Sequence, residues 1–252
     1  MIIKSIFKIH FLFYVVSFIC IITGLFKPFL IITILIVIHE LGHLLMALYY
    51  GWKIDKIIIF PFGGVTKFNE KINKPIREEF LILIMGPIIQ IIFYFLCDYF
   101  FGYNAMLEKY HYTLLIFNLL PIFPLDGSKL VHLFLEKFFS FKQSHLINLL
   151  ISFIVLIICL IMIINKFNLF FLFLFLLLLI KVFNEYNNHD ELFNKFLIER
   201  YLYSFNFKKK CFIKSLNVNK MRRDYRHLFL DKNKYITEQS VLCKRFDFKS
   251  KT

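Results

Sequence analysis

The chain has 252 residues, of which 59% are hydrophobic and 19% aromatic, and its mean hydropathy is +0.66. A soluble globular protein is usually about 45–50% apolar, so the composition excludes an ordinary soluble domain and predicts a membrane protein. The 31 Lys and Arg residues outnumber the 17 Asp and Glu residues, but they cluster between apolar runs, which favours orientation in a bilayer over direct binding of nucleic acid.

Six apolar runs are long enough, or nearly so, to cross a bilayer. A spanning helix needs about 20 mostly apolar residues, because about 30 Å of hydrocarbon is crossed at about 1.5 Å per residue. We therefore expect an all-α polytopic membrane protein with about six transmembrane helices, a small re-entrant or hairpin element and a short cytoplasmic tail. The runs are Ile6 to Phe26, Phe29 to Tyr50, Phe80 to Phe101, Tyr112 to about Leu125, Leu146 to Asn165 and Phe167 to Lys181.

The basic residues predict the orientation. Six crossings place both termini on one side, and nearly all Lys and Arg residues then fall on that side, leaving Lys27, Lys109 and Lys166 on the other. Because basic residues stay cytoplasmic, both termini and the 51–79 loop are expected to be cytoplasmic. The first run resembles a signal peptide but is long and lacks a small-residue cleavage site, so we expect it to be retained.

The second run contains the sequence HELGH, which places His39, Glu40 and His43 inside an apolar helix. Two His residues four apart leave the same helix face at a separation that one zinc ion can bridge. Glu40 is then able to reach a water molecule at the metal without filling a ligand position. Composition alone would produce this pattern on the order of 0.01 times in such a chain. The alternative is that the two histidines only pack against other helices and that Glu40 is incidental. It is less favourable, because placing three ionisable groups in a membrane span costs free energy.

Between the second and third runs, KIDKIIIFPFGGVTKF is rich in β-forming residues and contains Gly63 and Gly64. This pattern predicts a small hairpin or a re-entrant loop near the active face, whose edge could pair with an extended substrate. An ordinary connecting loop is the alternative. In the third run, Gly86 and Pro87 indicate close packing against a neighbouring helix, and Gln90 is a further polar contact.

The fourth run is short and is interrupted by prolines in FNLLPIFPLDGSKL. Non-helical backbone at membrane depth is expected where it lines a cavity or site. A catalytic zinc needs a third protein ligand, and Asp126 is the acid that ends an apolar segment, so we expect it to be that ligand. Asn118, earlier in the segment, could hold a substrate strand or form a helix-to-helix hydrogen bond.

The combination of HELGH with the later Asn118 and with PLDG at Pro124 to Gly127 resembles the site-2 protease family of intramembrane zinc metalloproteases. The span order, Gly86-Pro87 and the PFGG loop are similar to its sporulation branch. The resemblance covers about residues 1–185, implied to be a transmembrane zinc metalloprotease domain. It implies His39, His43 and Asp126 as the ligands of one Zn²⁺, Glu40 as the general base, and Asn118 as a substrate-binding residue. Residues 186–252 would be a basic cytoplasmic tail, with a weak echo of a nucleotide-responsive CBS domain.

The resemblance implies hydrolysis of a membrane-associated regulatory protein near the cytoplasmic face. In the sporulation branch this substrate is a sigma-factor pro-form on the mother-cell side, and membrane partners restrain the protease. Two alternatives remain. A membrane-anchored zincin that cuts soluble or loop substrates would take its third ligand from an acid such as Glu136, and a noncatalytic membrane scaffold would hold an incidental metal.

Overall fold

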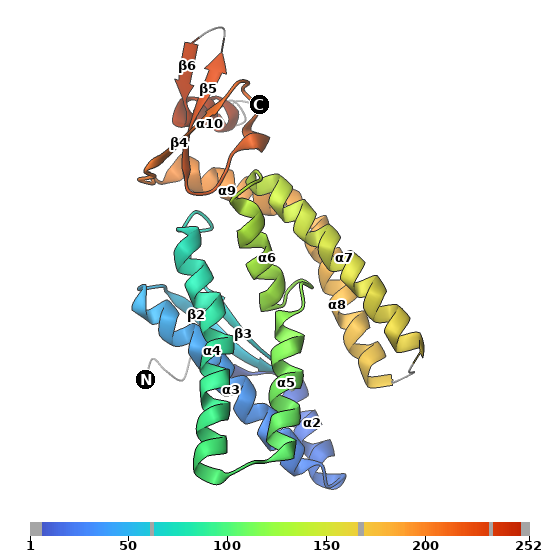
Figure 1. Cartoon of the computed structure of the whole chain (residues 1–252). Coiled ribbons are helices and arrows are strands. Elements are labelled where there is room, and N and C mark those ends of the chain that lie inside the picture. Colours follow the sequence, from blue (N-terminus) through green and yellow to red (C-terminus); the bar gives the residue numbers. More distant parts are fainter. Residues whose placement is uncertain (1–6, 61–62, 166–168, 232–233, 248–252) are drawn as a thin grey trace. The chain divides into compact units, whose positions relative to one another are not determined.

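The computed structural model describes residues 7–60, 63–165, 169–231 and 234–247. The described chain divides into two compact units, one within 1–70 and 77–120 and the other within 71–76 and 121–252. Each unit is described by itself below, and both are drawn in Figure 1.

The first unit combines helices with a small sheet. Its elements are β1 (Phe7–Ile9), α2 (Phe11–Ile22), α3 (Phe26–Tyr49), β2 (Ile54–Phe60), β3 (Gly63–Phe68), α4 (Ile76–Phe101) and α5 (Ala105–Leu119), with the first residue of α4 counted in the other unit. The strand order is β1-β2-β3, with β1 parallel and β3 antiparallel to β2. The predicted hairpin is thus confirmed as β2 and β3, and its tip at residues 61–62 lies outside the described residues.

Close helix packing in this unit depends on two glycines. A Cβ on Gly42 of α3 would lie 2.4 Å from the carbonyl oxygen of Met85 in α4, and one on Gly86 would lie 2.4 Å from the ring of His43. The predicted close approach at Gly86 is therefore confirmed. The backbones of α3 and α4 meet where the HELGH sequence lies, and only glycine leaves room for this contact.

The second unit contains the remaining helices and a second sheet. Its elements are α6 (Asp126–Glu136), α7 (Phe141–Asn165), α8 (Leu169–Asn187), α9 (His189–Leu202), β4 (Lys209–Ile213), the 3₁₀ turn η1 (Val218–Lys220), β5 (Tyr225–Asp231), β6 (Lys234–Thr237) and α10 (Glu238–Asp247). Strand β4 is parallel and β6 antiparallel to β5. A core that includes Phe141, Phe196, Met221, Phe229 and Leu242 joins the start of α7, α9 and this sheet.

The membrane-spanning elements differ from the expectation of six. Among the described residues, three helices are long and apolar enough to cross a bilayer: α3, α4 and 141–164 of α7. The pair α8 and α9, bent by 53°, would supply a fourth. The first predicted run forms a helix of 12 residues and the fourth one of 15, both shorter than the ~20 residues that a span needs. The expectation of an all-α fold is also too simple, because the described chain is mostly helical with two three-stranded sheets.

Candidate metal centre

His39 and His43 lie one turn apart on α3, and both are buried, with 1% and 5% of their surface exposed. Their Nε2 atoms are 3.2 Å apart, and their ring planes are inclined by 80°. The two imidazoles therefore face a common point, as the four-residue spacing predicts. This convergence on one point is the geometric requirement for a shared metal ion.

The Nδ1 atoms of the two rings are held by groups of α4. His43 Nδ1 is 2.8 Å from the carbonyl oxygen of Ile82, and His39 Nδ1 is 2.9 Å from Oε1 of Gln90. Because both partners are oxygen acceptors, each Nδ1 carries the proton and donates it. Each Nε2 is then left with an unprotonated lone pair.

The arrangement of the two Nε2 atoms fits a divalent metal. Two lone pairs that face each other at 3.2 Å repel unless a cation lies between them. For zinc with Zn–N bonds of about 2.0–2.1 Å and tetrahedral angles, two ligand nitrogens lie about 3.4 Å apart. The His pair is therefore preorganised for zinc by its own packing and by hydrogen bonds to α4.

Glu40 is buried and contacts the hairpin. Its Oε2 accepts a hydrogen bond of 2.5 Å from the hydroxyl of Thr66 on β3. A Cβ on Gly64 would lie 2.3 Å from Cγ of Glu40, so the absence of a side chain at that position makes room for the glutamate. One carboxylate oxygen is thereby fixed, and the carboxylate is held next to the first histidine of the pair.

Asn118 lies in the last turn of α5, with its Nδ2 3.4 Å from Nε2 of His39. This contact between α5 and α3 corresponds to the helix-to-helix alternative for this residue. The side chain is nevertheless next to the position where a bound metal would lie. Its role as a substrate-binding residue stays a prediction.

Asp126 belongs to the second unit, so its role as the third ligand also stays a prediction. It is the first residue of α6, is 9% exposed, and has Lys129 Nζ 3.1 Å from its Oδ1. The sequence predicts that Asp126 ends an apolar segment. In the structure the helix of that segment, α5, already ends at Leu119, and Asp126 is the first residue of the next helix, where the helix dipole stabilises a carboxylate.

Glu136, the third ligand in the zincin alternative, has a different partner. It is 1% exposed, and its Oε2 lies 3.3 Å from a guanidinium nitrogen of Arg223 in the same unit. A buried carboxylate paired with a buried guanidinium has a structural reason to be there. This contact weakens the zincin alternative.

Two contacts of this centre were not predicted from the sequence. Thr66 gave no signal in the sequence, since one threonine in a β-rich segment is ordinary. Gln90 was singled out as a polar contact, but its partner His39 is 51 positions away. An amide in an apolar run is the signal that pointed to Gln90, but it does not identify the partner.

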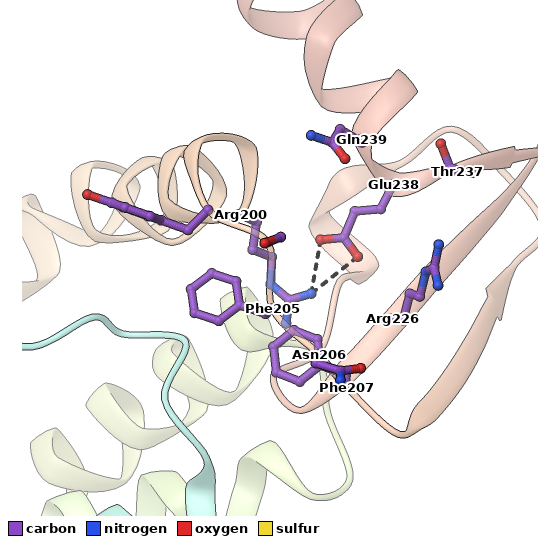
Figure 2. Close-up of a pocket in the computed structure, with 10 residues that line it drawn as sticks. Arg200, Phe205, Asn206, Phe207, Arg226, Thr237, Glu238 and Gln239 are labelled. Atoms are coloured by element: carbon purple, nitrogen blue, oxygen red, sulfur yellow. Dashed lines mark hydrogen bonds and ion pairs between the residues drawn. The ribbon is translucent and has the colours of Figure 1, made fainter. Parts of the chain in front are cut away.

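A separate cavity of about 480 Å³ lies in the second unit, between the end of α9 and the start of α10 (Figure 2). Arg200 lies at its wall and donates to Glu238, with N···O distances of 3.0 and 3.3 Å. The Arg200 guanidinium also lies over the rings of Phe196 and Phe207. Its hydrogen bonds with Glu238 and its ring contacts indicate that Arg200 stabilises the tail.

Comparisons with known proteins agree with this geometry. Residues 28–111 match the family model described as peptidase family M50. The chain is 33% identical over 148 residues to stage IV sporulation protein FB of Bacillus subtilis, a match that covers 56% of this chain and 51% of that protein. It is 35% identical over 126 residues to a zinc metalloprotease of Methanocaldococcus jannaschii, covering 46% of this chain and 36% of that protein. The chain thus spans about half, or less, of the length of these relatives.

A solved structure is also similar. The site-2 protease from Methanocaldococcus jannaschii matches with a TM-score of 0.55 and 28% identity, covering 71% of this chain and 89% of that one. Together with the apolar helices, this likeness identifies an integral, multi-pass membrane protein.

Proposed function

Because this chain belongs to peptidase family M50, the site-2 protease family, we propose that it is an intramembrane zinc metalloendopeptidase. The observation that carries this proposal is the pair of buried imidazoles whose Nε2 atoms face each other at 3.2 Å, with both tautomers fixed by oxygen acceptors on α4. A packing role would not require two lone pairs to converge below the surface of a helix bundle. A metal ligand role does.

We propose His39, His43 and Asp126 as the ligands of one Zn²⁺ ion per chain. Two neutral imidazoles and one carboxylate form a donor set that zinc favours in catalytic sites, with a fourth position open. Asp126 suits this role by its chemistry, because it is a carboxylate at the start of a helix that follows a non-helical, proline-containing stretch. Support for its assignment also comes from the resemblance of PLDG to the family's motif.

When bound to these residues, zinc would supply Lewis acidity for the hydrolysis. Glu40 acts as the general base that takes the proton of the attacking water and returns it to the leaving amine. Its hydrogen bond from Thr66 to Oε2 holds the carboxylate in one orientation. Asn118, next to His39, is placed to donate its amide to a substrate carbonyl.

The substrate is proposed to be a membrane-associated regulatory protein cut near the cytoplasmic face. Similarity to stage IV sporulation protein FB over half of its length supports a role in sporulation, with a sigma-factor pro-form as substrate and inhibitory membrane proteins as partners.

We place both termini and the 51–79 loop in the cytoplasm, because these segments carry most of the basic residues. We further propose residues 1–185 as the protease domain and 186–252 as a cytoplasmic, CBS-like tail.

The test is cleavage of tethered substrates by the full chain. Candidate membrane-anchored transcription factors would be co-expressed with the wild type, with Glu40→Gln and with Glu191→Gln, a matched change at an exposed glutamate. A shortened product with the wild type and with Glu191→Gln, and none with Glu40→Gln, is expected. Glu40→Gln should still bind one zinc.

The alternatives predict other outcomes. Undiminished cellular function of Glu40→Gln would favour the noncatalytic scaffold. Loss of zinc from Glu136→Gln, with retention by Asp126→Asn, would favour the zincin that cuts soluble or loop substrates.

A further inference from the structure

We propose that Gln90 is a positioning residue that fixes the tautomer and the ring orientation of His39, and thereby sets the affinity of the site for zinc. This inference rests on the proposed function, because it assumes that His39 is a zinc ligand. It concerns a residue in α4 that lies outside the HELGH and PLDG motifs. Its measurable consequence is a binding constant, which can be determined in the absence of any substrate.

Gln90 has no exposed surface and lies in an apolar helix. Its Oε1 is 2.9 Å from Nδ1 of His39, and its Nε2 is 3.1 Å from the carbonyl oxygen of His111 in α5. The side chain therefore joins three helices through one amide. A buried amide must have its hydrogen-bonding groups satisfied, and these contacts satisfy both ends of it.

The direction of this amide is fixed by its second partner. A backbone carbonyl oxygen can only accept a hydrogen bond, so the NH₂ group of Gln90 must face His111 and the oxygen must face His39. An oxygen facing Nδ1 in turn requires the Nδ1–H tautomer of His39. Nε2 of His39 is left unprotonated, which is the state that binds a metal.

His111, the second partner of the Gln90 amide, is itself firmly packed. His111 is 1% exposed, and its ring is stacked on Tyr94 with centroids 4.4 Å apart and planes inclined by 11°. Tyr94 lies one turn beyond Gln90 on α4, so α4 and α5 are joined by the stack as well as by the amide. The oxygen that faces His39 is therefore held by a packed pair of helices.

Without the amide, the two histidines would differ in how they are held. His43 would keep its hydrogen bond to the Ile82 carbonyl, whereas the Nδ1–H of His39 would lose the amide oxygen that accepts from it. The ring could then rotate or change tautomer, which places a proton on Nε2. Loss of such an outer partner of a zinc-bound histidine typically lowers metal affinity about 10- to 100-fold.

The experiment measures the zinc dissociation constant of the full chain in detergent by competition with a chelator. Gln90→Met, which keeps the length but removes both polar ends, is expected to weaken zinc binding about 10- to 100-fold. Peptidase activity should return when zinc is raised above the new dissociation constant. Gln90→Glu, which in its protonated form can donate to His111 and accept from His39, should bind zinc within about 10-fold of the wild type.

The control is Gln239→Met, the same change at an exposed glutamine of the tail, which should leave zinc affinity unchanged. If Gln90→Met does not fold, Gln90→Asn gives the same test, because its amide is too short to reach both partners. Zinc affinity within about twofold of the wild type in the folded variant would overturn the proposal. A wild type that binds zinc but cleaves no substrate would contradict the proposed function and leave this comparison valid.

Discussion

The hydroxyl of Thr66 on β3 donates a hydrogen bond of 2.5 Å to Oε2 of Glu40 on α3. The hairpin therefore contacts the proposed general base directly, and the glutamate is oriented by a residue 26 positions away. A base that is hydrogen-bonded through one oxygen presents the other in a fixed direction. Orientation of this kind contributes to rate because proton transfer requires close alignment.

Removal of the Thr66 hydroxyl should lower the rate of cleavage and leave zinc content unchanged. Thr66→Val keeps the shape of the side chain and loses one hydrogen bond to a charged group, which is worth about 1.5–3 kcal/mol. A fall in kcat of about 10- to 100-fold is expected, with KM little changed. Thr66→Ser should restore most of the rate, and a Thr66→Val protein with wild-type kcat would refute the assignment.

Gly86→Ala should disrupt the metal centre. The added Cβ would lie 2.4 Å from the His43 ring and 3.0 Å from Nε2 of His39, so the imidazoles must move away from it. Overpacking of this kind costs about 1–3 kcal/mol, and we expect reduced zinc content by elemental analysis together with a lower melting temperature. Gly63→Ala is the control and should behave as the wild type, because a Cβ there has no atom of the described residues within 4 Å apart from its chain neighbours.

Removal of zinc should leave the first unit folded. Nδ1 of each histidine is bonded to α4, and α3 packs closely on α4, so the site is held without the ion. We expect chelation to abolish cleavage with little change in helical circular dichroism, and added zinc to restore activity. Loss of helical signal together with zinc would show that the ion organises the fold, as it does in zinc fingers.

Arg223→Met should destabilise the second unit without loss of zinc. It removes a charge that neutralises the buried Glu136 carboxylate, and breaking one side of a buried ion pair costs about 3–5 kcal/mol. Thermal melting would show the loss. Asp190→Asn provides the comparison, because the Lys142–Asp190 pair is more exposed and such pairs contribute about 0–1 kcal/mol. Loss of zinc from Arg223→Met alone would point back to Glu136 as a ligand.

Acid should weaken the tail through His227 and Glu238, whose Nδ1 and Oε2 are 3.0 Å apart. Burial lowers the pKa of His227. Burial opposes ionisation of Glu238, but the hydrogen bond from His227 and the charge of Arg200 outweigh it and lower the pKa of that carboxyl. Both groups bind fewer protons in the folded tail than in the unfolded one. The two groups therefore make their whole contribution to the stability of the tail above about pH 6.5, the unfolded pKa of histidine. This contribution decreases as the pH falls below that value.

Hydrogen exchange measured by mass spectrometry across residues 225–231 would follow this effect, because faster exchange reports opening of the strand. Exchange in this strand should accelerate between about pH 6.5 and 4 after correction for the intrinsic rate. The variant His227→Gln should lose the histidine part of the dependence. Exchange that slows as the pH falls would contradict the expected direction of the effect.

The central part of the site could be predicted from the sequence, because its spacing is local. Two histidines four residues apart on a helix must share a face, and Gly63 and Gly64 between β-forming residues favour a hairpin. The contacts of Gln90 with His39 and of Thr66 with Glu40 could not be predicted, since they depend on the packing of helices and strands far apart in the chain.

The number of spans was harder to predict for a related reason. An apolar run shows what is compatible with lipid, but helix limits depend on caps and neighbours. Asn104 starts α5 by accepting hydrogen bonds from the backbone of residues 106 and 107, and the helix ends at Leu119, before the prolines. The tail sheet gave only a weak signal, because its strands are only four to seven residues long and mix charged with apolar residues.

Arg223 also binds the 71–76 segment, since its Nε donates to the carbonyl oxygen of Lys74 at 2.8 Å. One guanidinium of the tail thus connects the loop that precedes α4 with Glu136, the last residue of α6. Asp126 is at the opposite end of that 11-residue helix, about 15 Å away along its axis. A change in the tail that displaced this guanidinium would remove the contact that ties the last residue of α6 to the segment before α4, so the tail helps to hold the helix that begins at Asp126.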